Sequence, residues 1–161
     1  TALIKLGVIF VPGTLQLTKK DVAYRANAAN IEMFVCVNDE YVLTQVENAL
    51  PEAPCIKHRA MVGGGKREGW ADFNEVISTF PETFERSDAV ADLNNNAVMQ
   101  MYFTSGTTGK AKGVMLSEHN LISCVYYGLQ VATIQTKCLS VLPYHHTYEL
   151  HTTTNWNKEA P

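Results

Sequence analysis

The stretch that decides the fold is AVMQMYFTSGTTGKAKG, residues 97–113, in which an apolar run leads directly into a loop of small and hydroxylated residues. Ala97–Phe103 is rich in apolar and aromatic residues and follows a cluster of turn formers, which predicts a strand. Ser117 is a good N-cap for a helix through Val131, in which apolar residues recur at four-residue spacing. The loop between this strand and this helix is therefore the first place to look for function, since loops carried by a rigid scaffold often hold it.

The loop Thr104–Gly113 has a composition suited to anions. It holds three glycines, four hydroxylated side chains and the two lysines Lys110 and Lys112. Glycines permit a tight turn and the close approach of a ligand, and successive backbone N–H groups in such a turn form an anion-binding nest. Hydroxyl and ammonium groups add donors for phosphate oxygens. The segment is therefore predicted to bind phosphate.

A flexible linker or the P-loop of an NTPase would share some features of this loop. A linker rich in Ser, Thr and Gly has a similar composition, but linkers rarely join an apolar strand to an amphipathic helix. The P-loop requires G-x-x-x-x-G-K-[ST]. Here Gly106 and Gly109 are three residues apart and Ala111 follows Lys110, so that pattern does not fit.

The rest of the chain alternates between strand and helix patterns, which is typical of an α/β fold with a largely parallel sheet flanked by helices. The short apolar runs do not alternate with polar residues, as expected for a sheet covered on both faces. Strands are expected at Val8–Val11, Met33–Val37, Lys57–Val62 and Leu139–Leu142, and helices at Lys19–Ala29, Glu40–Leu50 and Asp72–Phe80.

A turn cluster at Asp92–Asn96 predicts a boundary between two sub-domains. The first would comprise residues 1–96, and the second, residues 97–161, would begin with the strand that carries the loop. The chain opens at Thr1 in the middle of an amphipathic pattern and without a start methionine, so both sub-domains are expected to be truncated.

The composition excludes several classes of partner. The net charge is −3, and Lys and Arg are scattered along the chain, which argues against nucleic-acid binding. No apolar run approaches the ~20 residues that span a bilayer. Charged residues make up 18%, below the roughly 25% of an average domain, so parts of the surface are expected to be covered by other protein, as in a homo-oligomer.

The cysteines Cys36, Cys55, Cys124 and Cys138 show none of the close pairs that a zinc or redox site needs. Buried free thiols are typical of a reducing compartment, so a cytoplasmic location is expected. No metal-ligating residues are predicted.

The segment Tyr102–Gly113, YFTSGTTGKAKG, closely resembles the phosphate-binding signature of the adenylate-forming (AMP-binding) enzymes. That superfamily includes acyl-CoA synthetases, luciferases and the adenylation domains of peptide synthetases. The sequence departs from the signature at Ala111, where the family usually has proline, and the lysine important to the family falls on Lys112. By this resemblance the nucleotide-binding residues are Thr104, Ser105, Gly106, Thr107, Thr108, Gly109 and Lys110, and Lys112 is catalytic.

The resemblance extends over roughly Ala2–Glu149. The segment Leu142–Glu149, LPYHHTYE, is similar to the family's next signature, in which a histidine lies near the acyl-adenylate. That match assigns His146 to the substrate side as a second catalytic residue, with His145 in the place usually held by an aromatic residue. Without the resemblance both would be ordinary turn histidines, and their spacing with His151 fits no standard zinc site.

Three other segments leave questions open. Gly63–Trp70, GGGKREGW, would either grip phosphate or CoA, or form a solvated loop pinned by Trp70. Met61–Phe73 resembles the acetyl- and medium-chain branch of the acyl-CoA synthetases, whereas Val141–Glu149 resembles the long-chain branch. Leu150–Pro161 is polar and turn-like where the family continues into an apolar helix.

The resemblance implies that the chain is an incomplete segment of the large N-terminal domain of an acyl-CoA synthetase, an AMP-forming ligase. The full-length enzyme would use ATP, Mg2+ and CoA to activate a carboxylic acid, such as a fatty acid, and transfer it to CoA. The segment alone would be inactive. Two alternatives are an adenylation or luciferase-like enzyme with another acceptor, and a non-catalytic fragment that binds nucleotide.

Overall fold

The computed structural model describes residues 2–83, 85, 88, 93–94, 96–104 and 109–131. The chain divides into two compact units, which we call the α/β unit (residues 14–85) and the hairpin unit (residues 1–13 with 86–161). This division differs from the one expected from the sequence, because residues 1–13 group with the later part of the chain. The sub-domain boundary between residues 96 and 97 stays a prediction.

The α/β unit begins with α2 (Lys19–Ala29), whose ends are set by its own sequence. The Thr18 hydroxyl accepts a hydrogen bond from the backbone N–H of Asp21, and the Asp21 carboxylate accepts one from the backbone N–H of Thr18. This reciprocal capping box satisfies N–H groups that the first turn leaves without partners. Asn30 ends the helix in the left-handed conformation, with φ 49°. Both ends of the predicted helix are confirmed.

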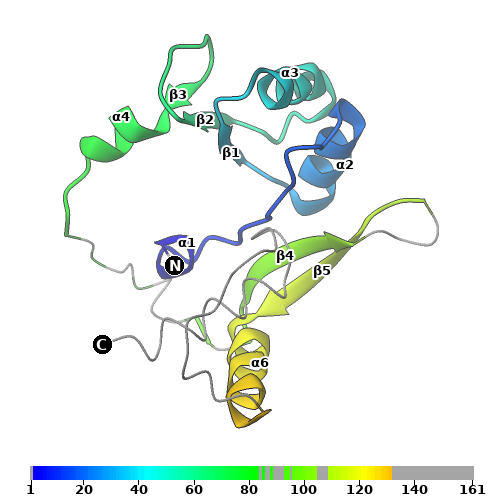
Figure 1. Cartoon of the computed structure of the whole chain (residues 1–161), viewed down its shortest axis with the longest axis vertical. Helices are drawn as coiled ribbons and strands as arrows, with labels where there is room; N and C mark the ends of the chain where they lie inside the picture. Colours follow the sequence, from blue (N-terminus) through cyan, green and yellow to red (C-terminus); the bar gives the residue numbers. More distant parts are fainter. Residues whose placement is uncertain are drawn as a thin grey trace. The chain divides into compact units, whose positions relative to one another are not determined.

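Parallel strands follow: α3 joins β1 to β2, and a loop joins β2 to β3 (Figure 1). β1 pairs with β2, Met33 opposite His58 and Val37 opposite Val62, and β2 pairs with the short β3, which was not expected from the sequence. The elements are β1 (Met33–Val37), α3 (Glu40–Ala49), a 3-10 turn (Leu50–Glu52), β2 (His58–Val62), β3 (Ala71–Asp72) and α4 (Phe73–Ser78). The predicted parallel sheet with flanking helices is confirmed.

The core of the α/β unit lies between the sheet and the helices α2 and α3. Its largest fully buried members are Leu43, Val46 and Met61. The packed residues come from both helices, from the residue after the 3-10 turn, from β2 and from the loop before β3: Val22, Ala23, Ala26, Leu43, Val46, Ala49, Ala53, Met61 and Trp70. Burial of each of the larger side chains, Leu43, Val46 and Met61 among them, contributes about 1.5–3 kcal/mol.

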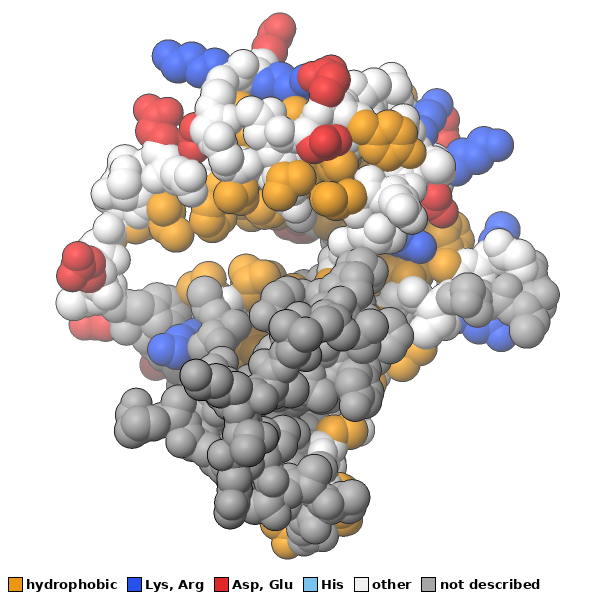
Figure 2. Space-filling view, viewed as in Figure 1, with side chains coloured by type: hydrophobic (Ala, Val, Ile, Leu, Met, Phe, Trp, Pro, Cys, Tyr) orange, Lys and Arg blue, Asp and Glu red, His pale blue; other side chains and the backbone are white. Residues whose placement is uncertain are grey.

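Within the α/β unit, the other face of the sheet is only partly covered, whereas the strands were expected to be covered on both faces. Figure 2 shows a row of hydrophobic side chains along one margin of the α/β unit. Met33, Val35 and Val37 are 52%, 47% and 44% exposed. They alternate with the half-buried Phe34 and Cys36, which pack against the α2–α3 core. Alternation along a strand places the two sets on opposite faces.

The hairpin unit contains α1 (Ala2–Lys5), β4 (Val98–Thr104), β5 (Lys112–Ser117) and α6 (Glu118–Val131). β4 and β5 are antiparallel, and the bonds of the Ser117 side chain with Asn120 confirm the expected start of α6. β5 was not expected. The apolar run Val8–Val11, predicted as a strand, contributes only the pairing of Phe10 beside β4, and Pro12 and Gly13 follow it at once. The predicted strand Leu139–Leu142 lies outside the described residues.

The capping box at Thr18 predicts a measurable contribution to stability. Thr18→Ala removes one acceptor and should lower the free energy of unfolding by about 1 kcal/mol, read from urea denaturation. The bond from Thr18 lowers the pKa of Asp21 in the folded state. A lowered folded pKa stabilises the fold above the unfolded pKa of roughly 3.9, and this contribution is lost as the pH falls through the folded value. The difference between wild type and variant should therefore shrink in acid; a constant difference would contradict the role of Asp21.

Candidate functional site

The glycine-rich loop connects the two antiparallel strands β4 and β5. The ladder runs from Val98 opposite Ser117 to Thr104 opposite Lys112, and the Thr104 hydroxyl donates to the backbone carbonyl of Lys112 at 3.4 Å. From the sequence, the loop was expected between a strand and a helix. That expectation was wrong in one respect, since Lys112 and Gly113 already belong to β5. The loop therefore starts and ends at paired positions of one hairpin.

Gly109 takes a conformation that favours glycine. Its φ is +84°, in the left-handed region, and a Cβ atom at this position would meet no atom of the described residues within 4 Å. The backbone conformation, and not lack of space, is therefore what disfavours a side chain here.

The two lysines of the loop are available to an anion. Lys110 and Lys112 are exposed, and none of the ion pairs among the described residues involves them. Lys112 is held at the end of the β4–β5 ladder, whereas Lys110 belongs to the loop itself. The hairpin thus brings Thr104, Lys110 and Lys112 to one end, with their polar groups open to solvent.

Gly113 makes the stem of the hairpin close-packed. A Cβ atom there would lie 3.0 Å from the sulfur of Met101 and 3.6 Å from the Phe103 ring. Phe103 is the cross-strand partner of Gly113, so the ring covers the place where a side chain would stand. An aromatic residue over a strand glycine favours one register, and this register sets Thr104 opposite Lys112.

Two buried polar side chains lie on β4, the strand that leads into the loop. Gln100 is fully buried and Tyr102 is 7% exposed. Neither the Gln100 amide nor the Tyr102 hydroxyl has a hydrogen-bond partner among the described residues, and burial raises the pKa of Tyr102. Gln100 was not predicted from the sequence, although a glutamine inside an apolar strand is an identifiable signal.

The structure describes part of the predicted site. Thr104, Gly109, Lys110 and Lys112 lie together as expected of a single loop. Ser105–Thr108 lie outside the described residues, as do His145 and His146. The assigned roles of all these residues stay predictions.

The second glycine-rich segment, Gly63–Trp70, is held by internal contacts. Arg67 makes paired hydrogen bonds to Glu47, at 2.6 and 2.8 Å, and bonds to Glu40 at 2.7 and 3.2 Å. The bonds from Arg67 lower the pKa values of both carboxyl groups. The Trp70 indole N–H donates to Glu47 at 2.9 Å. Because two carboxylates occupy the guanidinium, Arg67 is not presented to a phosphate.

Further contacts fix the rest of this segment. The Asn38 amide donates to the Gly64 carbonyl at 2.7 Å, and Arg59 donates to the Gly69 carbonyl at 2.9 Å while lying 5.9 Å from the centre of the Trp70 ring. Of the two interpretations of Gly63–Trp70, these contacts favour a loop pinned by Trp70.

The described part of the chain shows neither a metal centre nor a membrane span. Within it, no three His, Cys, Asp or Glu side chains are grouped so that they could hold a metal ion. Nor does any helix there combine the length and apolar character needed to cross a bilayer.

Comparison with known proteins gives consistent results. The family model described as AMP-binding enzyme matches residues 1–156. The mouse protein named acyl-coenzyme A synthetase ACSM4, mitochondrial, is 32% identical over 120 residues, and its human counterpart of the same name is 35% identical over 120 residues. Each alignment covers 74% of this chain and 20% of the relative, so the chain spans about one fifth of their length.

Solved structures share the fold. The ATP-bound MatB from Rhodopseudomonas palustris superposes with a TM-score of 0.73 at 22% identity, covering 96% of this chain and 29% of that one. At this identity the likeness concerns the fold alone, and it agrees with the parallel α/β arrangement expected from the sequence.

The expectation of a cytoplasmic location is wrong, since these relatives are named as mitochondrial proteins. Free thiols indicate a reducing environment but do not tell the cytoplasm from other reducing compartments. Cys124 is also exposed, not buried as the sequence suggested. The family model matches residues 1–156, and the glycine-rich loop lies at the end of the β4–β5 hairpin. The chain therefore belongs to the AMP-binding enzyme family.

Proposed function

We propose that this protein, as a polypeptide of family length, is an AMP-forming acid–thiol ligase that activates a carboxylic acid with ATP and passes the acyl group to CoA. The open cationic end of the β4–β5 hairpin is the observation that carries the proposal. The relatives named acyl-coenzyme A synthetases support it. The 161 residues alone are proposed to be inactive, because they span about one fifth of those relatives.

The reaction has two steps. A carboxylate oxygen attacks the α-phosphorus of ATP, the bond from that phosphorus to the bridging oxygen breaks, and pyrophosphate leaves with the charge. The CoA thiol, on losing its proton, then attacks the acyl carbonyl, and AMP departs. Phosphoryl and nucleotidyl transfers of this kind depend mainly on positioning and on stabilising the charge of the leaving group.

The loop would bind the β- and γ-phosphates. Lys112, fixed by its pairing with Thr104, would meet the charge that builds on pyrophosphate. Lys110 and the Thr104 hydroxyl would add donors, together with Ser105, Thr107 and Thr108. Gly106 and Gly109 would let the backbone approach the phosphates closely. A stem of fixed register keeps Lys112 in place, which a preorganised site requires.

The loop suits phosphate oxygens better than it suits a cation. Its described residues offer hydroxyl and ammonium groups, and the described part of the chain forms no metal-ligating group. No residue of this chain is therefore assigned to Mg2+, which the family would use with ATP. The acid is a carboxylic acid of the fatty type, and His146 would lie beside the acyl-adenylate.

Substitutions in the loop test the proposal in the family-length protein. Lys112→Ala should slow adenylation by about ten- to a thousand-fold, because one charge that stabilises the leaving group is removed. The loss should fall on kcat more than on KM. Gly109→Val should do comparable harm, since a β-branched residue resists a φ of +84°. The measurement is ATP–pyrophosphate exchange.

Two controls accompany that experiment. Ala111→Pro brings the loop to the family pattern and should leave exchange nearly unchanged. The isolated 161-residue chain should show no exchange. If Lys112→Ala and Gly109→Val keep normal thermal midpoints and exchange at the parent rate, the loop does not bind the leaving group and the proposal fails.

The pair of histidines gives a separate test. In the family-length protein, His146→Ala should impair adenylation while ATP binding, measured by calorimetry, stays nearly intact. His145→Phe restores the aromatic residue usual in the family and should be mild. A greater loss in His145→Phe than in His146→Ala would mean that the motif is misplaced by one residue.

A further inference from the structure

The two buried polar side chains of β4 call for a partner. Gln100 is fully buried and Tyr102 is 7% exposed. Neither the oxygen nor the nitrogen of the Gln100 amide, nor the Tyr102 hydroxyl, has a hydrogen-bond partner among the described residues. A polar group that is buried in this way loses its bonds to water, which costs free energy unless another group replaces them.

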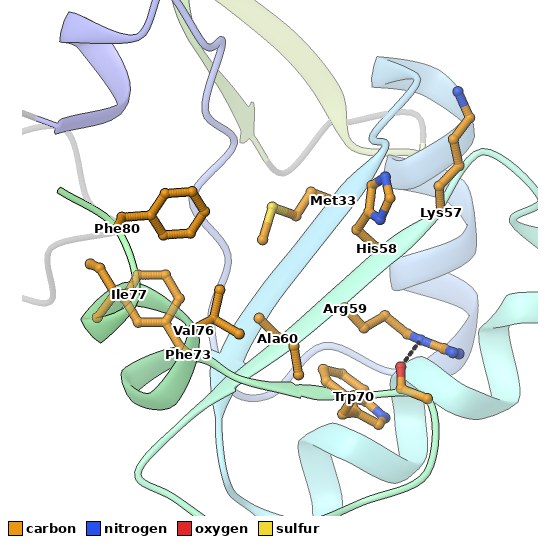
Figure 3. A pocket seen from close by; sticks show the side chains of 12 residues that line it. Met33, Lys57, His58, Arg59, Ala60, Trp70, Phe73, Val76, Ile77 and Phe80 are labelled. Atoms are coloured by element: carbon orange, nitrogen blue, oxygen red, sulfur yellow. Dashed lines mark hydrogen bonds between the residues drawn. The ribbon is translucent and has the colours of Figure 1, made fainter. Parts of the chain in front are cut away.

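Polar side chains of the α/β unit show the more usual arrangement. Arg59 donates to the Gly69 carbonyl at 2.9 Å, the dashed bond in Figure 3. The Trp70 indole N–H donates to Glu47 at 2.9 Å, and Trp70 is 8% exposed, almost as buried as Tyr102. Most buried polar groups in proteins are bonded either to protein or to ordered water. Two unpartnered side chains on one strand therefore indicate a bound molecule.

Gln100 and Tyr102 lie on the same face of β4. The ladder with β5 is in continuous register from Gln100, opposite Leu116, through Tyr102, opposite Val114. Residues two apart on a strand share a face, and their Cα atoms are about 6.7 Å apart. The two side chains do not bond to each other. A single molecule that bonds to both would have to be small, because two hydrogen bonds of about 2.8 Å span no more than about 5.6 Å.

The three unpartnered atoms select the chemistry of that molecule. The Gln100 amide offers both a donor and an acceptor, and the Tyr102 hydroxyl can act as either. Burial raises the pKa of Tyr102, so its hydroxyl keeps its proton at neutral pH. An anion would be repelled by the Gln100 oxygen, and a cation by the Gln100 NH2 group. Water both donates and accepts, and buried waters typically make about three hydrogen bonds to such groups.

We propose that Gln100 and Tyr102 bind a buried water on this face of β4, and that the water holds in place the strand that leads into the glycine-rich loop. Thr104 lies two residues beyond Tyr102 on the same face and pairs with Lys112. The water site would therefore support the stem from which the loop begins. The proposal does not depend on the activity proposed for the loop, so its test needs no turnover.

Hydrogen exchange of the β4 amides tests the proposal in the 161-residue chain. The Met101 N–H, which donates to the Phe10 carbonyl at 3.0 Å, is one of these amides. Tyr102→Phe removes only the hydroxyl, and Gln100→Met replaces the amide with an apolar chain of similar length. Each should speed exchange about five-fold, because the water loses a partner and the remaining polar group stays buried. Tyr126→Phe, which removes a hydroxyl from a side chain that is 59% exposed, should change nothing.

The double variant separates a shared water from two independent groups. With Gln100 and Tyr102 both replaced, no polar group is left without a partner, so exchange should be accelerated by much less than the product of the two single effects. Independent effects that simply multiply would overturn the proposal. So would slower exchange in each single variant, which would mean that both polar groups are buried without any partner.

Two further measurements complete the test. The single variants are also compared in the family-length protein, and acceleration that occurs only there would assign the partner to another segment of that polypeptide and overturn the proposal. If Gln100→Met fails to fold, NMR of the unaltered chain decides: the side-chain NH2 of Gln100 should show a nuclear Overhauser effect to a long-lived water, and this signal should weaken in Tyr102→Phe. Its absence in the unaltered chain would contradict the proposal.

Discussion

The backbone pairing of β4 is the constraint on which the hairpin unit depends. On one edge β4 runs antiparallel to β5, in continuous register from Gln100 to Thr104 and with an irregularity between Val98 and Gln100. On the other edge the Phe10 N–H donates to Met99 and the Phe10 carbonyl accepts from Met101, at 3.2 and 3.0 Å. A strand held on both edges cannot slip by one residue without exchanging its buried and exposed sides. The position of Lys112 at the mouth of the loop follows from that register.

Arg67 of Gly63–Trp70 and the two lysines of the β4–β5 loop differ in their contacts. In Gly63–Trp70, Arg67 is held by Glu40 and Glu47, and the same Glu47 accepts from Trp70. This segment therefore stabilises the α/β unit through its own contacts. In the β4–β5 loop, Lys110 and Lys112 are exposed and make no ion pair with any described residue. The carboxylates of Glu40 and Glu47 therefore bring Arg67 into internal contacts, while Lys110 and Lys112 have no such carboxylate among the described residues.

The elements that the sequence predicts well depend on residues that lie close together along the chain. The ends of α2 depend on Thr18, Asp21 and Asn30, all within one turn of the helix termini, so the prediction of that helix was accurate. β5 was missed because Lys112–Ser117 becomes a strand only through pairing with β4, and β3 was missed because two residues carry no periodic pattern. The glycine-rich loop was located correctly, since its signal lies in consecutive residues. The burial of Gln100 and the ion pairs of Arg67 depend on residues distant in sequence, and no local pattern encodes them.

The low content of charged residues, 18%, and the exposed valines of β1 have a common physical cause. A strand such as MFVCV lacks the polar residues that would let one of its faces meet water, although alternation places Val35 and Val37 on a face that no described helix covers fully. The other face, toward α2 and α3, is closed by residues that are almost completely buried, such as Val46 and Met61. The same sheet therefore has one face that α2 and α3 cover and one face that the described helices cover only in part. An apolar face of this kind is typical of a surface that contacts other protein.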